Sequence, residues 1–332
     1  MKKDWSNVGL IAFLPLLAVV MLYTTEIVWR NSFFFCTTGH CNESILDHIW
    51  NVLSVNPDSN PPSSTNLDER ELTALRYGGR LTWYLLGEFY LFVCLAALVV
   101  AAMLIFQLSP HQPFVRMLGA LLLSLLVGLF LFRNPKIHMA VFLIILEKTI
   151  KHDVPAIIPM TDFFNSLGNA AAFALLLASC ATLFPSPETA YPQGMKLLSQ
   201  KMKALRLVLY TGTILLVGTM LLKRAIFQWA LAYTSQEEQA VEAARLFISN
   251  LLTMDGGFYT LILAAAYLPA SLILQRRAQR LPDLPVEEPE KEKKLKEHGL
   301  VFSWAESFPR ILAILGPFLV GPVGELLNVI VK

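Results

Sequence analysis

Long apolar runs recur along the chain and are separated by shorter polar segments. Crossing about 30 Å of hydrocarbon at about 1.5 Å per residue takes roughly 20 mostly apolar residues. The runs that approach or meet this length are 8–28, 81–106, 114–132, 163–184, 207–229 and 257–274. They lack the alternation of membrane β-barrel strands. The pattern therefore predicts an all-α, polytopic integral membrane protein with about six transmembrane helices, to which re-entrant or interfacial helices are added.

Two segments predict the re-entrant or interfacial helices. The segment near 136–151 follows Asn134-Pro135, a suitable N-cap and first-turn pair, but its uncharged part is too short to span. If it did cross, the orientation of every later helix would reverse. The segment near 236–252 opens on Ser235-Gln236-Glu237-Glu238, which has the form of a capping box. Its apolar residues form one stripe, so it lies on the membrane or packs against another helix, and we favour packing.

Basic residues beside the runs predict the orientation. If the N-terminus is cytoplasmic, three basic clusters share the cytoplasmic side: Lys2 and Lys3, the cluster from Lys196 to Arg206, and the cluster from Arg276 to Arg280. We therefore expect a protein of the plasma membrane, or of the inner membrane in a bacterium, with both termini cytoplasmic. The first run could be a cleaved signal peptide, but no small-x-small cleavage site follows it, so we interpret it as a retained anchor.

The same pattern divides the chain into five regions. These are a membrane anchor at 1–29, an external loop at 30–80 with a Pro/Ser-rich flap, a five-helix membrane bundle at 81–275, a charged, solvated cytoplasmic linker at 276–299, and an apolar tail at 300–332. Gly316-Pro317 and Gly321-Pro322 interrupt the tail, and each proline removes a backbone donor. We expect a bent hairpin or two short helices that associate with the membrane or the spans without crossing. The candidate assembly contacts in the tail are Trp304, Phe308, Phe318 and Glu325.

Two cysteines in the external loop, Cys36 and Cys41, are separated by turn-forming residues. An oxidising compartment would join them in a local disulfide, which we favour over unpaired thiols and over a metal site with the nearby histidines. The spacing does not match the strong zinc patterns, so no metal is predicted. Cys94 and Cys180 fall inside apolar runs, where cysteine behaves as a small buried hydrophobe.

Polar residues within or beside the runs are the best pointers to function, because an intramembrane charge is costly and usually faces protein or water. Glu26 and Glu88 would share the outer leaflet and could face one polar cavity. Alternatively, Glu26 reaches the headgroups and Glu88 pairs with Arg30, Arg80 or a tyrosine hydroxyl. Asp162, Asn165 and Asn169 form a polar stripe at the start of the fourth run. Interhelical hydrogen bonding explains that stripe equally well.

Composition agrees with the membrane interpretation and narrows the function classes. The chain is 55% hydrophobic and 16% charged, against roughly a quarter charged in ordinary globular domains. A net charge of +2 without a concentrated basic face gives no reason to expect nucleic acid as a partner. The sequence contains no catalytic or nucleotide-binding motif, and no cofactor is expected.

Two function classes remain. The first is a non-enzymatic, oligomeric membrane protein that forms or regulates a pore or perturbs the bilayer. Its partners would be the lipid bilayer, further copies of the chain, and a protein partner that could bind through the tail. The second is a transporter or integral-membrane enzyme with a polar site near Glu26 and Glu88.

Overall fold

The computed structural model describes residues 69–108, 113–133, 157–184, 193–232, 238–281, 288–300 and 308–320. Within these ranges the chain is helical apart from short turns, and no strand is present. The helices are α3 (Glu69–Leu108), α4 (Pro113–Arg133), α6 (Ile157–Thr182), α7 (Gln193–Leu231), α8 (Glu238–Gln279) and α9 (Glu288–Glu297). One further helix, Phe308–Val320, is called the tail helix. The all-α prediction is confirmed.

Four of these helices contain stretches that are long and apolar enough to cross a membrane. The stretches are Arg76–Leu108, Ile157–Thr182, Gln193–Leu231 and Arg245–Gln279. Shorter apolar stretches occur at Val115–Val127 in α4 and in the tail helix. The predicted run at 114–132 is present only as the shorter stretch in α4, and the first predicted run and the predicted helix near 136–151 lie outside the described residues, so the count of six spans stays a prediction.

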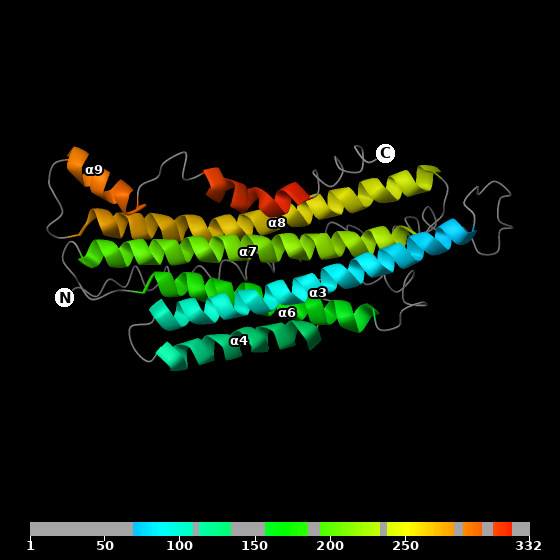
Figure 1. The fold of residues 1–332 in the computed structure, drawn as a ribbon, viewed down its shortest axis with the longest axis horizontal. Coiled ribbons are helices and arrows are strands. Elements are labelled where there is room, and N and C mark those ends of the chain that lie inside the picture. Colours follow the sequence, from blue (N-terminus) through cyan, green and yellow to red (C-terminus); the bar gives the residue numbers. More distant parts are fainter. Residues whose placement is uncertain are drawn as a thin grey trace, which may run out of the picture.

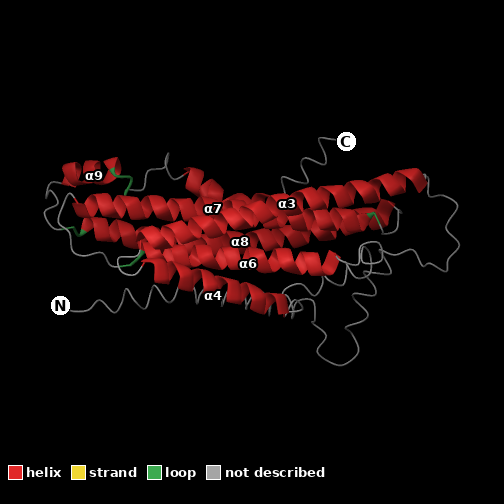
Figure 2. Cartoon of the chain, turned by 60° about the horizontal axis from the view of Figure 1, so that its bottom comes forward, coloured by secondary structure: helices red, strands yellow, loops and turns green. Residues whose placement is uncertain are grey.

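The long helices lie side by side as an elongated bundle (Figure 1). α3 packs against α6 and α7, α4 packs against α6 and α3, and α8 packs mainly against α7. α4 therefore forms one edge of the bundle in this view and in a second view (Figure 2), and in Figure 1 α8 lies on the opposite side of α7 from α4. The tail helix lies along α8, and α9 lies beside one end of α7 and α8 (Figure 1).

Small residues allow the central helices to approach closely. Ala97 and Ala101 of α3 and Ala171 of α6 are fully buried. Gly168 of α6 faces the hydroxyl of Tyr90, and a Cβ at this glycine would clash with that oxygen. The Tyr90 hydroxyl in turn lies 3.0 Å from Oγ1 of Thr219 in α7. Small residues combined with interhelical hydrogen bonds are a common basis for helix association in membranes.

Uncharged segments of the helices match the thickness of a bilayer. Residues 89–108 of α3 and 163–182 of α6 contain no charged side chain, and each spans about 30 Å. The 39-residue α7 is much longer and carries its charges in two groups, before 207 and at 223–224. The end of the bundle that contains Lys196, Arg206, Arg276 and α9 is called the basic end below.

α8 differs from the prediction of a separate interfacial helix near 236–252. The structure has one continuous helix of 42 residues, Glu238–Gln279, which includes the predicted span at 257–274. Gly256 and Gly257 do not break it, although a glycine inside a helix costs about 1 kcal/mol relative to alanine. Contacts with the tail helix at Gly256 offset this cost, and the local sequence does not reveal them.

The charged segment at 276–299 is also more ordered than the predicted solvated linker. α9 forms within it at Glu288–Glu297. Leu295 and Leu300 are buried in an apolar cluster with side chains of α7 and α8, among them Met195 and Leu274. Leu295 within the charged segment and Leu300 directly after it therefore dock this segment onto the basic end of the bundle.

Candidate functional site

The tail helix packs closely against α7 and α8. A Cβ placed on Gly256 of α8 would lie 2.5 Å from the carbonyl oxygen of Pro317 and 2.9 Å from Cα of Phe318. A Cβ placed on Gly316 of the tail helix would lie 2.9 Å from Cγ2 of Thr213 in α7. All three distances are shorter than real Cβ contacts. The docking therefore requires glycine at 256, where the opposing atoms are backbone, and it is close enough at Gly316 that an added Cβ would displace the Thr213 side chain.

A proline strengthens this docking instead of interrupting the helix. Pro317 has no N–H, which leaves the carbonyl of Ala313 without its usual helical donor. The Thr213 hydroxyl lies 2.9 Å from the Ala313 oxygen and 2.9 Å from the oxygen of Leu209 in its own helix, so one proton is shared between the two acceptors. The prediction that Gly316-Pro317 interrupts the tail is therefore wrong, because a neighbouring helix satisfies the freed carbonyl. Gly321-Pro322 lies outside the described residues.

The other face of the tail helix is apolar and exposed. Phe308 is 65% exposed and Leu312 is 50% exposed, while Ile311, Leu315 and Phe318 are 37 to 39% exposed. In a bilayer such a face contacts lipid tails or another apolar helix face. Of the predicted assembly contacts, Phe308 and Phe318 belong to this face, whereas Trp304 and Glu325 lie outside the described residues.

The end of α9 is shaped by Gly299, which has a φ of 66°. The amide of Gly299 donates to the Lys296 carbonyl and that of Leu300 to the Leu295 carbonyl, which together form a Schellman cap. The carbonyls of the turn then remain available to α7. Oγ of Ser199 donates to the His298 carbonyl at 2.9 Å. A terminal nitrogen of Arg206 donates to the Gly299 carbonyl.

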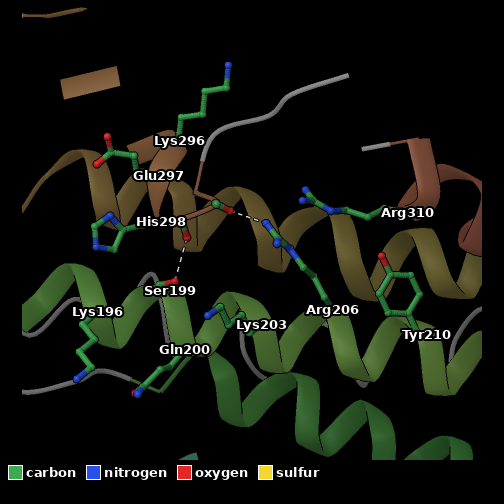
Figure 3. A pocket seen from close by; sticks show the side chains of 11 residues that line it. Lys196, Ser199, Gln200, Lys203, Arg206, Tyr210, Lys296, Glu297, His298 and Arg310 are labelled. Atoms are coloured by element: carbon green, nitrogen blue, oxygen red, sulfur yellow. Dashed lines mark hydrogen bonds between the residues drawn. The ribbon is translucent and has the colours of Figure 1, made fainter. Parts of the chain in front are cut away.

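A basic pocket forms where α7, the end of α9 and the tail helix meet (Figure 3). Its volume is about 590 Å³. The lining residues are Lys196, Ser199, Gln200, Lys203, Arg206, Tyr210, Lys296, Glu297, His298, Gly299 and Arg310. The lysines and arginines thus outnumber Glu297, the one acidic residue of the lining. The cluster on α7 was predicted only as an orientation signal, because Lys296 and Arg310 come from segments far along the chain.

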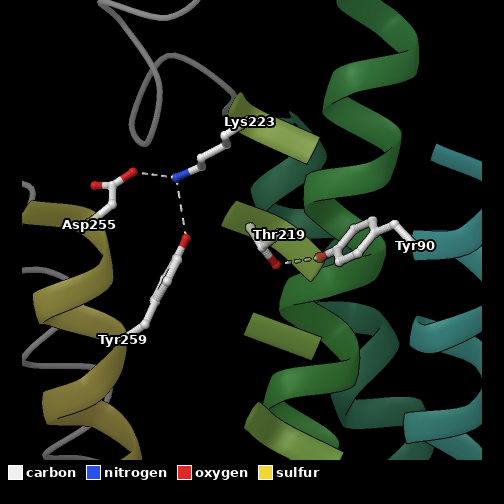
Figure 4. Close-up of polar contacts among 5 residues, drawn as sticks. All are labelled: Tyr90, Thr219, Lys223, Asp255 and Tyr259. Carbon is white, nitrogen blue, oxygen red and sulfur yellow. Dashed lines mark hydrogen bonds and ion pairs between the residues drawn. The ribbon is translucent and has the colours of Figure 1, made fainter. Parts of the chain in front are cut away.

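A second polar cluster lies toward the opposite end of α7 (Figure 4). Nζ of Lys223 is 2.7 Å from Oδ2 of Asp255 in α8 and 3.2 Å from the hydroxyl of Tyr259. Both charged side chains are at most one fifth exposed. Sequence reasoning did not single out this pair. A signal was available, since Asp255 is the one charged residue between Arg245 and Arg276.

The predicted polar site at Glu26 and Glu88 falls only partly within the described residues. Glu88 lies on the exposed face of α3 among Leu85, Phe89 and Phe92, which are each more than half exposed. Glu26 lies outside the described residues. A polar cavity shared by the two glutamates therefore stays a prediction.

The polar stripe on α6 is half-buried at Asp162, Asn165 and Asn169. The backbone carbonyl of Asp162 accepts a hydrogen bond of 2.7 Å from the Ser166 hydroxyl, and Asn165 also has an interaction partner. The hydrogen bond between Ser166 and Asp162 lies within α6, and the interhelical role of the stripe stays a prediction.

The cysteines inside the helices are confirmed as buried free thiols, at Cys94 in α3 and Cys180 in α6. Cys36 and Cys41 lie outside the described residues, and their disulfide stays a prediction. Alkylation with and without reductant, read by mass spectrometry, tests that prediction directly.

Comparison of the chain with protein-family models, with curated proteins and with solved structures found no match. The functional conclusions below therefore rest on the docking of the tail helix and on the geometry of the basic pocket.

Proposed function

We propose that this chain is a non-enzymatic, oligomeric membrane protein that forms or regulates a pore or perturbs the bilayer, and that the tail helix is its regulatory contact. The docking of the tail helix against α7 and α8 carries the proposal. It joins a segment late in the sequence to two candidate spans through Gly256 and Gly316. Because this contact depends on two glycines and one shared hydroxyl proton, the tail helix would dock and undock as one rigid element.

The orientation is part of the proposal. The basic end, which includes α9 and the cluster from Lys196 to Arg206, faces the cytoplasm because lysine and arginine concentrate on that side of membrane proteins. The tail helix then extends along α8 from the cytoplasmic side, where Arg310 lines the same pocket as Arg206, toward the level of Arg224. Its C-terminal carbonyl at Val320 accepts a 3.4 Å hydrogen bond from Arg224, a favourable position for a cation.

Self-association is supported by exposed apolar faces on two helices. The face of the tail helix at Phe308 and Leu312 and the face of α3 at Leu85, Phe89 and Phe92 are all about half exposed or more. Lipid covers such faces in a monomer, and a second copy or a partner protein covers them in an assembly. Glu88 lies on the α3 face and favours assembly there, because a charge facing lipid is costly.

Truncation after Leu300, which keeps the capped and docked end of α9 and removes the tail helix, tests the proposal. The shortened protein and the full-length protein are reconstituted into liposomes that contain a self-quenched dye, and their oligomers are measured by native mass spectrometry from a mild detergent. We expect the truncated protein to insert but to form weaker oligomers and to change dye release by at least about threefold. Unchanged oligomers together with unchanged dye release would contradict a regulatory tail.

A transporter or integral-membrane enzyme with a polar site near Glu26 and Glu88 is the second candidate. The position of Glu88 on an apolar face favours it, because a carboxylate there needs a polar partner. Glu88→Gln, compared with Glu242→Gln at an exposed position of α8, distinguishes the two candidates. Loss of ion or proton uptake in Glu88→Gln alone would support the second candidate, and unchanged fluxes in both variants would remove it.

A further inference from the structure

We propose that the basic pocket binds the phosphate group of an anionic ligand. The site consists of α7, the end of α9 and the tail helix, and none of these elements forms it alone (Figure 3). The inference rests on the observed docking of α9 and the tail helix, and it holds whether or not the chain forms a pore.

Charge is the first observation that points to an anion. Lys196 and Lys203 from α7 and Lys296 from α9 are exposed side chains that line the same pocket. Within the described part of the chain none of these three lysines forms an ion pair. Like charges that share a concave site repel one another, and a bound anion removes this repulsion.

The fixed position of the Arg206 side chain is the second observation that points to an anion. One of its terminal nitrogens is held by the Gly299 carbonyl. This contact fixes the guanidinium in the lining of the pocket. A planar guanidinium held in place suits the paired oxygens of a phosphate. Arg310 of the tail helix lines the same pocket and adds a second guanidinium.

The position of the pocket limits the source of the phosphate. Arg206 directly precedes the uncharged segment of α7 at 207–222, and Tyr210 lies in the first turn of that segment. The pocket that both residues line therefore lies at the boundary between hydrocarbon and water. Phospholipid headgroups occupy that level, and phosphate compounds from the aqueous phase also reach it. The volume of about 590 Å³ falls within the range of ligand pockets. A phosphate ester or free phosphate is the chemistry that both sources share.

The test uses the full-length protein in phosphatidylcholine nanodiscs. One arm adds phosphatidylglycerol to the nanodiscs and measures retained lipid by native mass spectrometry. The other arm titrates inorganic phosphate and measures binding by calorimetry. The pocket variant is Lys196→Gln with Lys203→Gln. The control is Arg276→Gln with Arg280→Gln, which removes the same charge from exposed residues at the same end but outside the pocket.

We expect one probe to bind the wild type and the control, and to bind the pocket variant at least about tenfold more weakly. Retention of phosphatidylglycerol identifies a lipid headgroup, and saturable phosphate binding identifies a soluble ligand. Lys296→Gln on α9 is a second variant with the same expected direction if the first fails to fold. The proposal is overturned if neither probe binds, or if the pocket and control variants lose binding equally.

Discussion

Replacing Gly256 by alanine is expected to separate the tail helix from α8. The added Cβ would lie 2.5 Å from the Pro317 carbonyl oxygen and 2.9 Å from Cα of Phe318. Both are backbone atoms of a helix and cannot rotate away. The neighbouring Gly257 provides a matched control, because a Cβ there would meet only Cδ2 of Phe318 at 4.0 Å, an ordinary contact.

The expected change in docking free energy follows from this difference in Cβ contact distances between Gly256 and Gly257. Restoring an ordinary separation requires the tail helix to move outward by about 1 Å, and overpacking of this kind costs about 1 to 3 kcal/mol. Both variants gain about 1 kcal/mol of intrinsic helix stability, because each replaces a glycine inside α8. Comparing them cancels that gain. The docking equilibrium should therefore differ by roughly five- to 150-fold between Gly256→Ala and Gly257→Ala.

Spin labels at Leu268 of α8 and Leu312 of the tail helix measure the docking. Both side chains are about half exposed, so the labels should not disturb the contact. In a cysteine-free background, pulsed electron resonance should give one narrow distance for the wild type and for Gly257→Ala. Gly256→Ala should give a broad distribution shifted to longer distances. Identical distributions for the two alanine variants would refute the docking by close backbone approach.

Two further predictions concern the ion pair and the topology. Lys223→Met should destabilise the protein by about 3 kcal/mol, because it leaves Asp255 charged and without its 2.7 Å partner. Adding Asp255→Leu should recover most of the lost stability, measured as the midpoint of thermal unfolding. A double variant as unstable as the single variant would contradict this prediction. Reporter fusions near Asn60 should be external and those near Lys201 and Glu290 cytoplasmic, since basic residues concentrate inside; an external reporter at 201 or 290 would defeat the proposed orientation.

The sequence by itself determined the helical class and the placement of the candidate spans. Run length is a local property, since about 20 apolar residues must be helical to cross hydrocarbon whatever their neighbours are. The prediction that Cys94 and Cys180 are buried is also confirmed, and it rested on the behaviour of cysteine as a small hydrophobe within an apolar helix. The basic clusters beside 207 and after 275 were equally visible, because each is contiguous in the chain.

The tertiary structure decided where helices continue and which polar groups meet. The chain stays helical through Gly256-Gly257 and through Gly316-Pro317 because each of these pairs packs against a helix distant in sequence. Thr213 reaches a carbonyl that a proline set free 100 residues later. Helix propensities assign a free-energy cost to each glycine and proline inside a helix, but only the packing against a partner helix shows how that free energy is recovered.

The basic pocket and the ion pair depend on the fold for the same reason. Arg206 and Gly299 are 93 residues apart, and Lys223 and Asp255 are 32 residues apart on different helices. Sequence patterns show which side chains are charged, but two charges interact only when packing brings their helices into register. The apolar contacts of Leu295 dock α9 beside α7, and that docking turns a row of cations on one helix into a pocket.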